Sequence, residues 1–154
     1  MVVFRRHPAN RLRAEKEARQ PVVLVVDDEI FVRSAVAEYL RISGYTVVEA
    51  ANAVEAIAVF VSGEPIDVVF SDVRMPGPTD GLRLARWVYQ HHPGIPVVLT
   101  SGNGDATAIE HVAEFFVSKP YRAAEVANRI HLLLEEVRHQ GGSTEDGMSE
   151  LEPL

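Results

Sequence analysis

The sequence predicts an α/β protein in which a five-stranded parallel sheet lies between two layers of helices. Apolar, β-branched runs alternate along the chain with segments of helical periodicity, and glycines or prolines separate many of them. Alternating strands and helices imply right-handed crossovers, which make the strands parallel and cover both faces of the sheet. The flavodoxin-like, doubly wound order 2-1-3-4-5 is one of the two common solutions, and we expect it here with five helices.

The first two strands and helices are defined by clear local signals. Val22–Val26 is a continuous apolar run, which is typical of a strand buried on both faces. Apolar residues at helical spacing predict a helix over Glu29–Ser43, and Tyr45–Glu49 reads as the second strand. Asn52 can cap the next helix, Ala53–Ser62, and a glycine follows each of the two helices.

The middle of the chain predicts a buried strand, a loop and a helix. Ile66–Ser71 is again a short apolar run, and Asp72–Thr79 is rich in proline and glycine. Asp80 can cap a third helix that runs to about His92, because Pro93-Gly94 breaks the chain there.

The last third of the domain completes the alternation. Ile95–Thr100 is the fourth predicted strand, and Ser101–Asp105 is a loop of small residues. A short fourth helix is expected within Ala106–Val112, before a fifth strand at Glu114–Ser118. Arg122–His139 is predicted to be the last and longest helix.

Composition limits the class of protein. The chain has 154 residues, of which 47% are hydrophobic and 24% are charged, which suits one globular domain. It has no cysteine, so disulfides and thiolate sites are excluded. No apolar run reaches the roughly 18 residues of a membrane helix, and the start of the chain lacks a secretory apolar stretch. We therefore expect a cytoplasmic protein.

Charge divides the chain into three parts. Residues 1–20 carry six Lys or Arg and two Glu, so this segment is basic. The whole chain, in contrast, has a net charge of −7. We expect a basic N-terminal extension over 1–20, solvated and partly helical, with contact to an acidic partner, a membrane surface or nucleic acid as the alternative. We expect residues 21–139 to form the folded domain and residues 140–154 to be a disordered acidic tail. The acidic body argues against a nucleic-acid surface.

Chemically active side chains follow four of the predicted strands. Asp27 and Asp28 end the first strand, Asp72 the third, Thr100 the fourth and Lys119 the fifth. In parallel sheets, ligands bind at this edge. Three carboxylates repel one another unless a cation lies among them, and oxygen ligands without His or Cys favour Mg²⁺.

The same side chains suit phosphoryl transfer to a carboxylate. Asp72 can act as the nucleophile. The cation and Lys119 can neutralise charge on the transferred group, and Thr100 supplies a hydroxyl donor. The sequence thus predicts a site that depends on positioning and electrostatics.

The motifs at these strand ends resemble those of the response-regulator receiver family of two-component signalling. They cover about Val22–Arg138 and stand in the family's order. The motifs are Val-Asp27-Asp28-Glu, Ser-Asp72-Val-Arg-Met-Pro-Gly, Asp80-Gly81, Leu-Thr100-Ser and Phe-Val-Ser-Lys119-Pro120.

The resemblance implies a role for each residue. Asp72 would be the phosphoacceptor, and Mg²⁺ would be held by Asp27, Asp28, Asp72 and the backbone carbonyl of Arg74. Thr100 and Lys119 would contact the phosphoryl group, and the Lys119–Pro120 peptide would be cis. The switch would pair Thr100 with Phe116, which turns inward after phosphorylation.

The resemblance also implies partners. A sensor histidine kinase or a histidine phosphotransferase would supply the phosphoryl group, and the short segment after the last helix predicts a stand-alone receiver. Such a chain would signal or relay through an output protein that the sequence does not name, and homodimerisation stays open. It would be no enzyme beyond its own phosphorylation and slow dephosphorylation.

Two rival functions fit the same fold. The first is a phosphorylation-independent interaction module that retains the acidic pocket. The second is a phosphatase that works through an aspartyl phosphate, which would normally need a further general acid. Val73 and Arg74, the residues after Asp72, supply none.

Overall fold

The computed structural model describes residues 8–102 and 115–141, and it contains the predicted sheet. The strands are β1 (Val22–Val26), β2 (Thr46–Ala50), β3 (Val68–Asp72), β4 (Val97–Ser101) and β5 (Phe115–Ser118). All are parallel, in the order β2-β1-β3-β4-β5. The predicted fold class and strand order are therefore confirmed.

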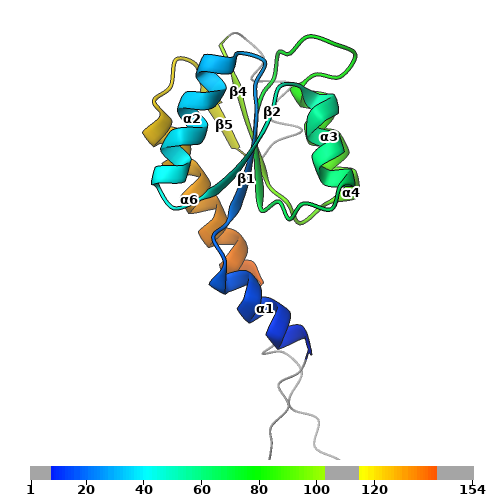
Figure 1. Cartoon of the computed structure of the whole chain (residues 1–154), viewed down its shortest axis with the longest axis vertical. Coiled ribbons are helices and arrows are strands. Elements are labelled where there is room, and N and C mark those ends of the chain that lie inside the picture. Colours follow the sequence, from blue (N-terminus) through cyan, green and yellow to red (C-terminus); the bar gives the residue numbers. More distant parts are fainter. Residues whose placement is uncertain (1–7, 103–114, 142–154) are drawn as a thin grey trace, which may run out of the picture.

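Helices cover both faces of this sheet (Figure 1). The described helices are α1 (Pro8–Ala18), α2 (Ile30–Ile42), α3 (Ala53–Val61), α4 (Gly81–His91) and α6 (Ala123–Gln140), of which α1 lies beyond the end of the sheet. Helices α2 and α6 contact each other on one face, and α3 and α4 contact each other on the other. The short helix expected within 106–112 and most of the tail expected over 140–154 lie outside the described residues.

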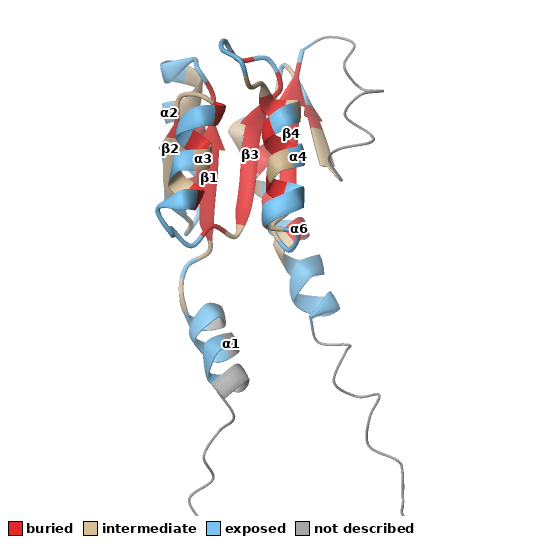
Figure 2. Ribbon diagram, turned by 90° about the vertical axis from the view of Figure 1, so that its right-hand side faces the viewer, coloured by how far each residue is buried: buried red, intermediate tan, exposed pale blue. Residues whose placement is uncertain are grey.

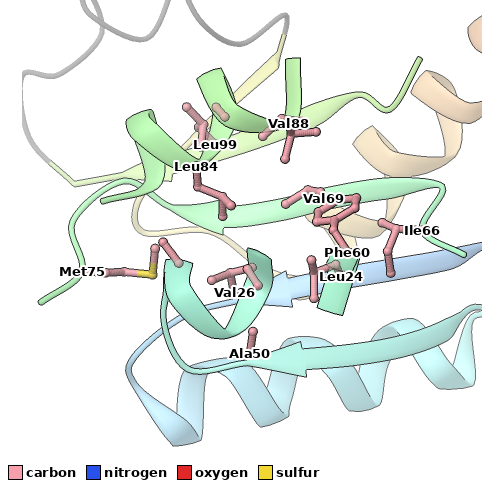
Figure 3. Packing of buried hydrophobic residues seen from close by; sticks show 14 of the residues in the cluster. Leu24, Val26, Ala50, Phe60, Ile66, Val69, Met75, Leu84, Val88 and Leu99 are labelled. Carbon is pink, nitrogen blue, oxygen red and sulfur yellow. The ribbon is translucent and has the colours of Figure 1, made fainter. Parts of the chain in front are cut away.

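Each face of the sheet has its own hydrophobic core. Side chains alternate between the faces along a strand, so Leu24 packs under α3 and α4 whereas Val23 packs under α2 and α6. Figure 3 shows the first core, in which Phe60 and Leu84 reach the strands. Every residue of β1, β3 and β4 is buried, as the red strands of Figure 2 show. Burial on both faces explains the continuous apolar runs of the sequence.

The predicted helix caps are present. The side chain of Asn52 accepts a hydrogen bond of 2.9 Å from the amide of Glu55, and Asp80 accepts one of 2.9 Å from the amide of Arg83. Gly44 and Gly63 follow α2 and α3 with φ angles of 96° and 84°, which lie in the left-handed region that favours glycine.

The N-terminal extension is anchored to the domain at its base. Arg19, which follows α1, donates two hydrogen bonds of 2.9 and 3.1 Å to the carboxylate of Asp67. Asp67 also accepts a bond of 2.8 Å from the amide of Val22, at the start of β1. Helix α1 gives the extension the helical character that was expected. Arg19, however, is bound to Asp67 of the domain, whereas the extension was expected to be solvated. None of the described helices is long and apolar enough to cross a membrane.

Gly81 lies in close contact with the backbone that carries Asp72. A methyl group at this position would overlap with the carbonyl group of Asp72 and would lie 2.8 Å from the Cα atom of Val73. The amide of Gly81 also donates a hydrogen bond of 2.8 Å to the carbonyl of Val73. This contact fixes the start of α4 against the end of β3.

We predict that Gly81→Ala lowers the free energy of unfolding by about 1 to 3 kcal/mol, because the backbone must move to admit the methyl group. Urea denaturation measures this change. Gly94→Ala is the matched control, since a Cβ atom there would meet no atom within 4 Å. Equal effects of the two substitutions would contradict the close contact at Gly81.

Candidate functional site

The carboxyl ends of four strands bring the predicted site residues to one edge of the sheet. Asp27 follows β1, Asp72 is the last residue of β3, and Lys119 follows β5. The register places Asp72 beside Thr100 of β4 and Thr100 beside Val117 of β5. Strand order and register therefore gather side chains that are far apart in the sequence.

Three carboxylates form a cluster at this edge. One oxygen atom from each of Asp27, Asp28 and Asp72 lies within 4.8 Å of the others. Asp27 and Asp72 are only 3% and 5% exposed, whereas Asp28 is exposed. Such a set of oxygen ligands, open to solvent on one side, fits a hard divalent cation such as Mg²⁺.

Lys119 supplies a positive charge beside Asp72. Its Nζ atom donates a hydrogen bond of 2.8 Å to Oδ2 of Asp72. Burial acts to lower the pKa of Lys119, but the hydrogen bond and the charges of Asp72, Asp27 and Glu29 outweigh burial and raise it. Lys119 is therefore a permanent cation at neutral pH.

Backbone amides orient two of the carboxylates. The amide of Glu29 donates a hydrogen bond of 2.9 Å to Oδ1 of Asp27, and the amide of Arg74 donates one of 3.2 Å to Oδ1 of Asp72. Asp72 is thus held through both oxygens, by Arg74 on one side and by Lys119 on the other. The role of the Arg74 carbonyl as a metal ligand stays a prediction.

The surroundings of Asp27 disfavour its ionised form in the folded state. Burial raises its pKa, and the charges of Asp72 and Asp28 raise it further, against the opposing effects of the Glu29 amide and Lys119. A raised folded pKa gives stability that is present at low pH and is lost as the pH rises through that pKa. The charged cluster therefore destabilises the fold at neutral pH, and a cation among the carboxylates would offset this.

The predicted switch residues occupy adjacent strands. Thr100 is 0% exposed, and its Oγ1 atom has no hydrogen-bond partner among the described residues. A buried hydroxyl without a partner is unusual in folded proteins. Phe116 of β5 pairs in register with Leu99 of β4. It is half-buried and packs against the core that contains Leu99, on the α3 and α4 side of the sheet. The Lys119–Pro120 peptide that follows is cis.

Two further residues near the site were not predicted from the sequence. Arg33 of α2 donates a hydrogen bond of 2.8 Å to the backbone carbonyl of Asp27 and one of 3.4 Å to Glu49 of β2. Tyr121 buries its hydroxyl without a partner among the described residues. Burial raises the pKa of Tyr121, as do the charges of Asp27 and other acidic groups. A basic residue one turn into the helix after Asp28 is a weak signal for Arg33.

Comparison with known proteins agrees with this geometry. The family model of the response regulator receiver domain matches residues 23–131, which is most of the described domain. The chain belongs to the response regulator receiver family. Receiver domains are signalling modules of two-component systems, and they interact with sensor kinases.

Two curated relatives and a solved structure illustrate the similarity. The chain is 38% identical over 107 residues to the C4-dicarboxylate transport transcriptional regulatory protein DctD of Rhizobium meliloti, covering 67% of this chain and 23% of that protein. It is 34% identical over 134 residues to the transcriptional regulatory protein AruR of Pseudomonas aeruginosa, covering 82% and 54%. The chain therefore spans about a quarter and about half of these relatives.

The solved structure is a receiver domain from Clostridium thermocellum. It superposes with a TM-score of 0.71 at 26% identity, covering 78% of this chain and 98% of that one. The similarity extends over the sheet and its helices, which are the elements that position the acidic edge.

Proposed function

We propose that this receiver accepts a phosphoryl group onto Asp72 from a phosphohistidine, in the presence of Mg²⁺, and signals or relays by a change of conformation. The donor would be a sensor histidine kinase or a histidine phosphotransferase of the cytoplasm. The observation that carries the proposal is the environment of Asp72. A buried carboxylate lies 2.8 Å from a lysine and within a cluster of three acidic side chains. A purely structural acidic group would not need this arrangement.

The acidic cluster would hold the cation through Asp27, Asp28 and Asp72, together with the carbonyl of Arg74. The ligand set fits, because these side chains offer only oxygen atoms and converge within 4.8 Å. Bound Mg²⁺ would supply positive charge that offsets the oxygens of the phosphoryl group. Arg33 would support the set by fixing the carbonyl of Asp27.

Asp72 and Lys119 would carry out the transfer. An oxygen of Asp72 forms a bond to phosphorus while the bond from phosphorus to the donor nitrogen breaks, and that nitrogen keeps the electron pair. Lys119, charged and already in contact with Asp72, then neutralises an oxygen of the transferred group. The low exposure of Asp72 limits access of water to the new acyl phosphate.

A signalling role follows from what surrounds Asp72. Val73 is buried and apolar, so it gives no general acid for rapid turnover. We therefore propose that the chain is no enzyme beyond its own phosphorylation and slow dephosphorylation. Its output would be contact with another protein, whose identity the structure does not define.

We predict that incubation with acetyl phosphate and MgCl₂ adds one phosphoryl group to the wild-type chain and none to Asp72→Asn. Intact-protein mass spectrometry measures this gain. Asp80→Asn is the matched control, because asparagine also caps helices and this residue lies outside the acidic cluster. No gain in the wild type would favour a phosphorylation-independent module, and a gain in Asp72→Asn would exclude Asp72 as the acceptor. Continuous release of phosphate from a generic phosphoester would indicate a phosphatase.

The buried hydroxyl of Thr100 would couple phosphorylation of Asp72 to a change of conformation in β5. We propose that Thr100 moves toward the modified Asp72 and forms there the hydrogen bond that its hydroxyl does not make with any of residues 8–102 and 115–141. Phe116, on the neighbouring strand, would then turn into the vacated space. The exposed face around β4, β5 and α6 would change as a result.

We predict that beryllofluoride, which stands in for a phosphoryl group on a carboxylate, shifts the amide NMR signals of Phe116 and Val117 when MgCl₂ is present. Thr100→Val should bind beryllofluoride and lose these shifts, because it keeps the shape of threonine without the hydroxyl. Thr46→Val is the control, since the hydroxyl of Thr46 contacts only Gln20, at 3.4 Å, among the described residues. Unchanged shifts in Thr100→Val would contradict the proposed switch.

A further inference from the structure

A pocket lies at the end of the sheet opposite the acidic cluster. Its volume is about 320 Å³, which is near the lower end for small-molecule sites. The lining comes from the end of α1 and the segment after it, from the segments that lead into β3 and β4, and from the end of α6. Figure 2 shows α1 and the end of α6 leaving the domain at this same end.

The walls of the pocket are mainly apolar. Pro21, Ile66, Ile95, Leu134 and Val137 line it. Ile66 is buried, and Figure 3 shows it in the core on the α3 and α4 side. Gly94 also lines the pocket, and a Cβ atom there would meet no atom within 4 Å, so this wall is open. Apolar walls at a solvent-accessible mouth favour a ligand with an apolar body.

The charges around the pocket leave an excess of positive charge. Asp67, the acidic residue of the lining, is already matched by two hydrogen bonds from Arg19 and lies 3.8 Å from Lys16. Arg138 lines the pocket and forms no ion pair with another residue of the described ranges 8–102 and 115–141. Lys16 and Arg138 therefore present cations to a ligand that enters.

The pocket is formed jointly by the matched receiver segment and by the segments of this chain that flank it. The family model covers residues 23–131, whereas Lys16 and Pro21 precede that range and Leu134, Val137 and Arg138 follow it. The ion pair between Arg19 and Asp67 holds the N-terminal wall against the domain. The two flanking segments thus add a concave, cationic surface to the receiver.

We propose that this pocket binds a small free carboxylic acid with an apolar body. The body lies against Ile66, Ile95 and Leu134, and the carboxylate meets Arg138 and Lys16 at the mouth. The guanidinium of Arg138 suits a carboxylate because it can donate two parallel hydrogen bonds. This binding is separate from phosphorylation of Asp72, so failure of either proposal leaves the other standing.

Sodium octanoate, titrated into the full chain, tests the proposal. Methyl NMR signals of Ile66, Ile95 and Leu134 should shift in a saturable manner, while those of Leu24 in the sheet should not. Acetate lacks the apolar body, octanol lacks the charge and octyltrimethylammonium has the opposite charge, so each should give weaker shifts. Equal shifts with octanol would remove the claim for an anion, and no saturable shift with octanoate would overturn the proposal.

Substitutions at exposed positions test the geometry without threatening the fold. Arg138→Gln should weaken octanoate binding by about two- to fivefold, the effect of an ion pair at a protein surface. Val137→Asp should weaken it further, because a carboxylate in the wall repels the ligand. Arg129→Gln, on the same helix but outside the pocket lining, is the matched control. Octanoate affinity that is unchanged by both pocket substitutions would place binding elsewhere and overturn the proposal.

Discussion

Repulsion among three carboxylates at one edge of the sheet is the constraint on which the site depends. Asp27 and Asp72 end neighbouring strands and are almost fully buried, so their charges are poorly screened by water. Lys119 and two backbone amides offset part of this repulsion, but the pKa of Asp27 stays raised. The folded chain therefore holds a site whose negative charge is incompletely neutralised, and a bound cation would neutralise it further.

The rest of the domain keeps these groups in place. β1 and β3 are buried on both faces, which leaves the side chains at their ends little freedom to separate. Gly81 lets α4 begin against the backbone of Asp72, and Arg33 ties the carbonyl of Asp27 to α2. The ion pair between Arg19 and Asp67 fixes the other end of the sheet. The favourable free energy of packing the two cores thus offsets the unfavourable free energy of bringing the three carboxylates together.

Much of this architecture could be predicted from the sequence because its signals are local. Continuous apolar runs mark buried strands, and parallel strands bring their ends together, so the residues that end the strands, Asp72 and Thr100 among them, could be expected at one edge of the sheet. The contact between Arg19 and Asp67 could not be predicted, since it joins residues 48 positions apart and depends on how α1 leaves the sheet. The pocket at the flanks was missed for the same reason. That the Thr100 hydroxyl has no partner within the part of the chain that the structure describes is a property of side-chain packing, which residue patterns do not encode.

The most direct test compares the free energy of unfolding of the wild type and Asp27→Asn, with EDTA and with MgCl₂. Without a divalent cation, Asp27→Asn should be the more stable protein, because it removes a buried charge that the cluster repels. MgCl₂ should stabilise the wild type by mass action and the variant much less, so that the difference shrinks or reverses. A wild type that is more stable in EDTA, or an equal gain for both proteins in MgCl₂, would contradict the account.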